Sequence, residues 1–171
     1  MLIDDNSQTN KRNDAIVDFK IYNYYNFLAK IKLEANKDIL KQLVYPVIGA
    51  CQEVHKQLGP FLNEYMYQDA LAIEFGLRNV PFEREYCFTA EYKGCPIDHK
   101  HFVDFRVMSG DTPIIVECKA VENLTDAHRQ QLWNYMRLTG INIGILYNFA
   151  LTYAKCEKYH YDVASSRMTA F

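Results

Sequence analysis

The chain has 171 residues, of which 49% are hydrophobic and 23% charged, with a net charge of -2. These values exclude a disordered chain and suit one soluble globular domain with a terminal extension. No apolar run of about 18 residues is present, so the sequence predicts no membrane span. The slightly acidic balance argues against a protein that binds duplex nucleic acid through a global positive field.

The cysteines and the N-terminus favour a reducing, cytoplasmic location. Five Cys occur, an odd number, and none forms a CxxC pair, which is typical of free thiols rather than of a disulfide scaffold. Residues 1–14 are polar and contain no apolar stretch of the kind that a signal peptide needs. We therefore expect no signal peptide.

Residues 1–37 form an N-terminal extension that we expect to be partly disordered and then helical. The apolar residues from 17 to 31 repeat in a 4-3-4-3 spacing, the seam pattern of a helix: Val17, Ile21, Tyr24, Leu28 and Ile31. Such a seam could be a dimerisation helix, which would make a homodimer, or an extra helix packed on the domain. It spans too few heptads to predict a coiled coil.

The rest of the chain, residues 38–171, reads as one domain that begins with two helices. The first is predicted over 38–58 from a continuous apolar stripe, and Pro46 either kinks it or marks its true start. Gly59-Pro60 ends it, and a second helix follows over about 62–78.

Strands then dominate the pattern. Alternating residues and turn signals predict strands over 83–92, 97–108 and 113–121, a helix from the Thr125 cap to Gly140, and a strand over 142–148. The tail after residue 150 gives no firm element. The order α-α-β-β-β-α-β indicates a mixed α/β fold whose sheet contains a central hairpin flanked by helices.

Three charged residues lie inside the apolar hairpin formed by 97–108 and 113–121. If the turn at 109–112 closes symmetrically, Met108 pairs with Pro113, and counting outward places Asp104 opposite Glu117. Lys119 is two residues beyond Glu117 and therefore shares its face. The sequence thus predicts one patch that carries two carboxylates and an amine.

Two readings of this patch remain open from the residues alone. Opposed carboxylates destabilise a strand pair unless a cation compensates them, and Mg²⁺ commonly uses only one or two carboxylates together with water and phosphate. Lys119 could then stabilise developing negative charge or orient a water molecule. The alternative is a structural ion pair in which Lys119 neutralises Glu117 and Asp104 caps the turn or faces solvent.

Asp104, followed thirteen residues later by Glu117-Cys118-Lys119, resembles the core motif of the PD-(D/E)XK nuclease superfamily. More closely, the chain resembles the GxxExxY family, a bacterial branch of that superfamily. The matching stretches are VIGACQEVHKQLGPFLNEYMYQDAL (47–71), VECKAVENLTDAHRQQLWNYMRLTG (116–140) and IGILYNF (143–149). Glu64 and Tyr67 stand at the motif's Glu and Tyr, whereas Phe61 replaces its Gly.

The resemblance implies a restriction-endonuclease-like core and a nuclease that acts on nucleic acid, with DNA favoured over RNA. Asp104 and Glu117, with Glu64 near them, would hold Mg²⁺ or Mn²⁺, and Lys119 would assist attack of water. Gln131, on the helix after the Glu-x-Lys strand, would help to orient the nucleophile.

Other residues could have supporting roles, or their roles have alternative interpretations. Tyr67 could support Glu64 or a phosphate, or it could be a core aromatic, and Tyr135 shares a helix face with Gln131. His128, one turn before, could approach the same groove. Cys95, His99 and His101 match no standard zinc spacing.

The alternative function is a catalytically inactive module of the same fold that binds or regulates, which the acidic pI and Phe61 favour. A third, weaker alternative is a toxin or defence component.

Overall fold

A computed structural model describes residues 36–171. The chain divides into two units, Met1–Leu40 and Lys41–Phe171, and the second unit carries the fold described below. The apolar seam over 17–31 lies outside the described residues. Among the residues described, no helix combines the length and the apolar character that crossing a membrane would require.

The elements follow the predicted order and add a hairpin at the end. A first helix ends at residue 58 and continues without interruption through Pro46. The remaining elements are α2 (Glu64–Leu77), β1 (Phe82–Tyr92), β2 (Cys95–Ser109), β3 (Thr112–Lys119), α3 (Asp126–Thr139), β4 (Ile143–Asn148), β5 (Lys155–Asp162) and β6 (Arg167–Ala170). The mixed α/β class is thus confirmed.

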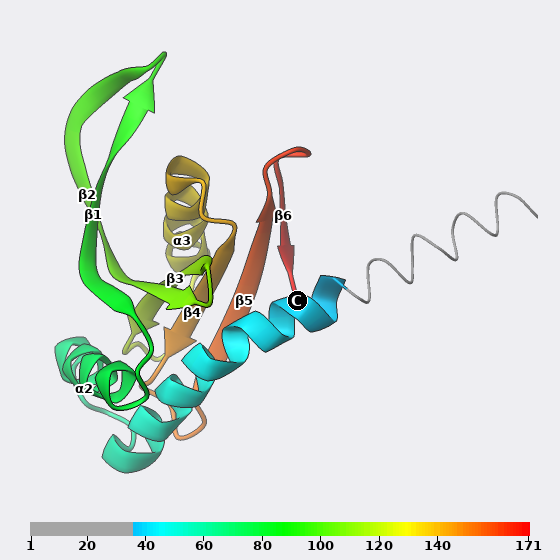
Figure 1. Ribbon diagram of the computed structural model, residues 1–171. Helices are drawn as coiled ribbons and strands as arrows, with labels where there is room; N and C mark the ends of the chain where they lie inside the picture. The colour runs from blue at the N-terminus through cyan, green and yellow to red at the C-terminus, as the bar shows by residue number, and fades with distance from the viewer. Residues whose placement is uncertain (1–35) are drawn as a thin grey trace, which may run out of the picture. The chain divides into compact units, whose positions relative to one another are not determined.

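The six strands form one sheet in the order β1-β2-β3-β4-β5-β6. All neighbours are antiparallel except β3 and β4, which are parallel because α3 carries the chain back between them. In the view of Figure 1, α3 stands between the long β1–β2 ribbon and the β5–β6 hairpin.

Turn chemistry sets the two hairpins that precede α3. The β1–β2 turn contains only Lys93 and Gly94, both at positive φ (52° and 76°), where the sequence predicted a longer turn. Two central residues at positive φ are the type I′ geometry that matches strand twist. The β2–β3 turn lies at Gly110-Asp111, so the symmetric closure predicted from the sequence is correct.

Apolar side chains cover both faces of the sheet. On one face, Phe75 of α2 packs against Phe105 of β2 with ring centroids 5.7 Å apart. On the other face, Leu132 and Met136 of α3 join Ile115 of β3 in a buried cluster. The sheet is therefore enclosed where β3 and β4 run through its centre, as both of these strands are almost wholly buried.

The start and the end of α3 are both fixed. Thr125 N-caps the helix, and its N–H donates to His128 Nδ1 at 3.1 Å. Gly140 ends the helix in the left-handed region.

A hydrogen-bonded ion pair joins α3 to β5. Arg129 donates to both carboxylate oxygens of Glu157 on β5 at 2.8 Å, and this hydrogen bonding lowers the pKa of Glu157 to about 2.

Close approach of α3 to β4 depends on Gly144. A Cβ at this position would lie 2.5 Å from Met136 Sδ and 3.0 Å from Leu132 Cδ1, both fully buried. Gly144→Ala should lower the free energy of unfolding by about 1–3 kcal/mol because it overpacks this core. Chemical denaturation would measure the change.

The matched control is Gly76→Ala on α2, where an added Cβ meets no atom within 4 Å. This substitution should stabilise the protein by about 0.5–1 kcal/mol through helix propensity. Equal effects of the two substitutions would contradict the close approach of α3 to β4.

Candidate active site

The candidate site lies where regular pairing between β2 and β3 stops. Met108 pairs with Pro113 and Phe105 with Val116, as the symmetric turn predicts, and the ladder ends at the latter pair. Beyond it, Asp104 uses its side chain instead: the Cys118 N–H donates to Asp104 Oδ2 at 2.8 Å. The Asp104 N–H in turn points at Glu117 Oε1, 3.4 Å away. The carboxylate therefore takes the place of a main-chain acceptor.

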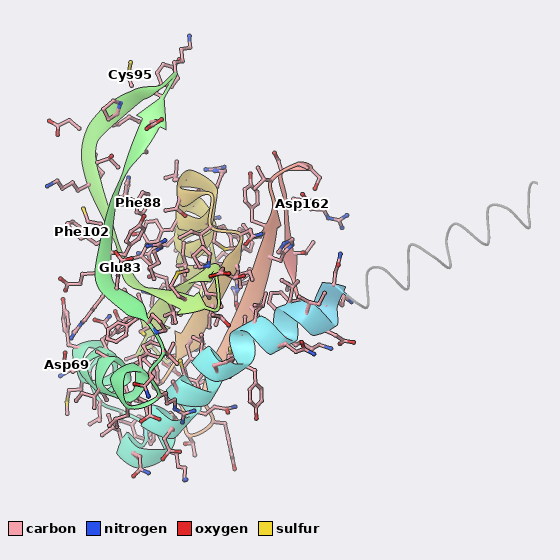
Figure 2. The ribbon with its side chains drawn as sticks, in the orientation of Figure 1. Asp69, Glu83, Phe88, Cys95, Phe102 and Asp162 are labelled. Atoms are coloured by element: carbon pink, nitrogen blue, oxygen red, sulfur yellow. The ribbon has the colours of Figure 1, made fainter. Side chains whose placement is uncertain are left out.

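At this point the apolar side chains of β1 and β2 switch from one face of the sheet to the other. Phe82 and Phe105 pack on the α2 side, whereas Tyr86 and Val103 pack in the α3-side cluster, although simple alternation would keep each strand's pair on one face. Figure 2 shows the result farther along the ribbon, with Phe88 toward α3 and Phe102 directed away from it.

Glu85 explains the change. It lies opposite Asp104, between the Arg84–Phe105 and Tyr86–Val103 pairs, and it adopts φ 50° within a strand. A non-glycine residue at positive φ turns the strand, and distortions of this kind often re-aim side chains beside active sites. The distortion directs Asp104 out of the regular β2 ladder.

Glu117 and Lys119 form a buried ion pair next to Asp104. Lys119 Nζ donates to Glu117 Oε2 at 3.2 Å, and the two residues are only 8% and 2% exposed. Lone charges at this depth would be costly, so each must compensate the other. The structure thus brings together the three charged residues that the hairpin register predicts.

The pKa values of the two carboxylates rise in this environment. Burial and the neighbouring charge of Asp104 raise the pKa of Glu117 to about 8. Burial also raises the pKa of Asp104, and the charge of Glu64 adds to that effect. For Lys119, burial lowers the pKa, but the charges of Glu117, Asp104 and Glu64 outweigh burial and raise it overall. Lys119 is therefore held protonated.

A hollow of about 330 Å³ opens beside Asp104. It lies between the start of α2 and the distorted part of the β1–β2 ribbon, and three carboxylates line it, those of Glu64, Glu85 and Asp104. Glu64 is the first residue of α2, whose N-cap Asn63 accepts from the Met66 N–H at 3.0 Å. Glu64 therefore shares a cavity with Asp104, as its predicted role near the metal requires.

Tyr67 is fully buried and holds the turn that precedes α2. Its hydroxyl donates to the Gly59 carbonyl at 2.7 Å and accepts from the Leu62 N–H at 3.2 Å, while its ring stacks on Phe149. Phe61, at the position of the motif's Gly, adopts φ 71°, which explains why glycine suits that position. Tyr67 is thus placed to fix where α2 and Glu64 begin.

Gln131 and Tyr135 lie on α3 in a different hollow. The Gln131 amide donates to the Tyr135 hydroxyl at 3.1 Å, and both line a cavity with His101 of β2. Neither shares the hollow that contains Glu64 and Asp104. The structure therefore groups Asp104, Glu117, Lys119 and Glu64, and it does not place Gln131 in hydrogen-bond contact with them.

Comparison with known proteins agrees with this geometry. A family model described as "PD-(D/E)XK nuclease superfamily" matches residues 41–159, which include every residue of the grouped site. The chain belongs to the PD-(D/E)XK nuclease superfamily. The six-stranded mixed sheet flanked by helices is consistent with the restriction-endonuclease-like fold of this superfamily.

A solved structure titled "Crystal structure of SSO0001" is similar over 70% of this chain, with 19% sequence identity and a TM-score of 0.41. The matched part spans 64% of that structure's chain, which is less than two thirds of its length. No curated protein matches the sequence.

The residues of this PD-(D/E)XK site fit a divalent cation that takes few protein ligands. Within residues 36–171, no three His, Cys, Asp or Glu residues are grouped as a ready metal site. Asp104 Oδ1 accepts no hydrogen bond from the described residues, and burial raises the pKa values of both Asp104 and Glu117, so a nearby cation would favour their charged forms. Mg²⁺ and similar ions often bind through one or two carboxylates, with water completing the shell.

Sequence reasoning missed two residues of the site. Glu85 gave no signal, because an isolated Glu in an alternating strand looks like an ordinary exposed residue. Asn148 did give one, since it is a polar residue at the end of the otherwise apolar strand β4.

Asn148 fixes the segment that follows Lys119. It is fully buried and pairs with Lys119 in the β3–β4 ladder. Its side-chain amide donates to the Val121 carbonyl at 2.6 Å, and its side-chain oxygen accepts from the N–H groups of Val121 (3.1 Å) and Ala150 (3.3 Å). This side chain therefore extends the sheet pairing beyond the end of β3.

Asn148→Ala should lower the free energy of unfolding by about 2–4 kcal/mol, because it leaves three partly buried main-chain groups of residues 121 and 150 without their partner. Asn142→Ala, at an exposed position shortly before β4, should change it by less than about 0.5 kcal/mol. Denaturant unfolding of both variants would measure the difference. An Asn148→Ala variant as stable as Asn142→Ala would contradict the bridging role.

Proposed function

We propose that this protein is a Mg²⁺- or Mn²⁺-dependent nuclease that hydrolyses phosphodiester bonds in nucleic acid, with DNA favoured over RNA. The observation that supports it is the grouping of Asp104, Glu117 and Lys119 at the end of the β2–β3 ladder. Superfamily membership supports the nuclease class, and the motif stretches support the GxxExxY branch. We also propose a cytoplasmic location, from the free cysteines.

Asp104, Glu117 and Glu64 would hold the cation. When bound, such an ion would neutralise phosphate charge and lower the pKa of a bound water. The chain's own part is to keep the carboxylates close and desolvated, since burial makes a compensating cation favourable there.

Lys119 would act as a fixed positive charge. Because the surrounding carboxylates raise its pKa, its amine stays protonated near neutral pH and is a poor base. Hydrolysis requires water to form a new P–O bond while the bond to the leaving oxygen breaks, and negative charge builds on the phosphate oxygens. An ammonium group placed beside that charge stabilises it. We therefore assign Lys119 to charge stabilisation rather than to proton abstraction.

Gln131 is proposed to orient the attacking water and Tyr135 to support Gln131. Their hydrogen bond fixes the amide on α3. Reaching a phosphate at Asp104 would require this pair to reorient when substrate binds. The seam over 17–31 stays a proposed dimerisation helix.

One observation favours the second candidate function, an inactive nuclease-fold module that binds or regulates. Both oxygens of Glu117 already have hydrogen-bond donors, the Asp104 N–H and Lys119 Nζ, so the Glu117 carboxylate is satisfied without an ion. A domain that had lost its metal could keep such a pair for stability.

Cleavage assays with single- and double-stranded DNA and RNA in Mg²⁺ or Mn²⁺ test the nuclease. Lys119→Ala should lower the rate at least about hundredfold, the size typical for losing one charge-stabilising group. Lys56→Ala is the matched control, since Lys56 is exposed and pairs with Glu53 at 3.6 Å, away from the site, and it should leave the rate unchanged.

Calorimetric titration of Mn²⁺ gives an independent readout. Wild type should bind the ion, and both Asp104→Asn and Glu117→Gln should abolish binding. Wild type that binds no Mn²⁺ and cleaves no substrate above the Lys119→Ala level would refute the nuclease and support the binding module.

A further inference from the structure

The outward face of α3 forms a ridge between two hollows. One, of about 500 Å³, lies between α3 and His101 of β2, and the other, of about 250 Å³, lies between α3 and Tyr161 of β5. Gln130, Asn134 and Arg137 line both hollows and are called the α3 ridge below. This arrangement agrees with Figure 1, where α3 stands between the ribbon and the C-terminal hairpin.

The α3 ridge carries no negative charge. No Asp or Glu occurs from residue 127 to 140, and Asp126 at the start of the helix is paired with Arg129 at 2.8 Å. Residues 127–171 contain five Lys and Arg against two Asp and Glu, a local charge of +3 in a chain whose total is -2. Residues 127–171 thus have a net positive charge, the sign that favours phosphate, although Arg129 is already paired with Asp126 and Glu157.

The α2 side of the candidate site is negatively charged. Its hollow is lined by the carboxylates of Glu64, Glu85 and Asp104 and by no Lys or Arg. This side suits a cation and repels a phosphate backbone. A nucleic acid is therefore favoured to approach along α3, which begins seven residues after Lys119.

Arg137 is available for a ligand. Of the six arginines in residues 36–171, four form ion pairs with carboxylates, while Arg137 and Arg167 have no such partner there. The Arg137 guanidinium donates instead to Asn134 Oδ1 at 2.9 Å, which holds the two side chains together. Arginine and side-chain amides are the groups that contact base edges and phosphates most often.

We infer that the α3 ridge is the surface on which this protein binds nucleic acid, with Arg137 on a phosphate and the amides of Gln130 and Asn134 on base edges. The inference deepens the proposed function, because it names the surface that would deliver substrate to the site. It also explains how a chain with a net negative charge could bind nucleic acid. A positive local surface suffices for binding when the negative charges lie on another part of the domain.

Binding is best measured without metal, so that cleavage does not intervene. Fluorescence anisotropy of labelled DNA and RNA in EDTA would compare the full-length wild type with Arg137→Ala and with the double variant Gln130→Ala/Asn134→Ala. Arg137→Ala should weaken binding about tenfold on all sequences and reduce the salt dependence by about one phosphate contact. The double variant should reduce discrimination between sequences and leave the salt dependence unchanged.

Lys56→Ala removes one exposed positive charge from the first helix and is the control for net charge. Circular dichroism and Mn²⁺ titration would check that each variant keeps its fold and its metal site. Arg137→Ala binding within twofold of wild type, an equal loss in Lys56→Ala, or no binding by wild type would each overturn the inference.

The outcomes separate this inference from the proposed nuclease. Loss of binding in the α3 ridge variants of a protein that cleaves nothing would support the ridge and reject the nuclease. Cleavage that depends on Lys119 but is unaffected in Arg137→Ala would support the nuclease and reject the ridge.

Discussion

The hydrogen bond from the Cys118 N–H to the Asp104 carboxylate is the contact on which the site depends. It occurs where main-chain pairing between β2 and β3 ends, so a side-chain oxygen accepts the hydrogen bond that a main-chain carbonyl of β2 would otherwise accept. Because Asp104 is tied to the residue between Glu117 and Lys119, all three charged groups are fixed by one local geometry. The strand distortion at Glu85 allows this geometry, because in a regular ladder the Asp104 carboxylate would not contact the Cys118 N–H.

Charge segregation follows from this contact. Asp104 lies in the hollow beside α2 with Glu64 and Glu85, burial raises the pKa values of Asp104 and Glu117, and the carboxylate charges keep Lys119 protonated. The helix α3 itself carries no carboxylate beyond its first turn, and Glu157, the β5 carboxylate that contacts it, is paired with Arg129. A cation is therefore favoured at the carboxylates and a polyanion along α3, and hydrolysis would require a phosphate of the bound polyanion to reach the cation.

Much of this site could be predicted from the sequence because turn residues set strand register. The turn around Gly110 fixed the pairing of Met108 with Pro113, and alternation then brought Asp104 and Glu117 together. Alternation could not reveal that β1 and β2 change faces, since Glu85 is an ordinary strand residue by composition. The C-terminal hairpin was also missed, because Tyr159 is the one buried residue of β5 and the strand shows little apolar periodicity. Gln131 illustrates what a sequence motif cannot predict. The motif placed this residue on the correct helix, but it did not predict which residues its side chain contacts.

The central claim is that the end of the β2–β3 ladder is a divalent metal centre. Crystals of the full chain grown with Mn²⁺ and measured at an anomalous wavelength test it directly. The account predicts an anomalous peak in contact with the carboxylates of Asp104 and Glu117. A structure that keeps the Lys119–Glu117 ion pair with no peak beside it, while Mn²⁺ binds elsewhere or not at all, would contradict it.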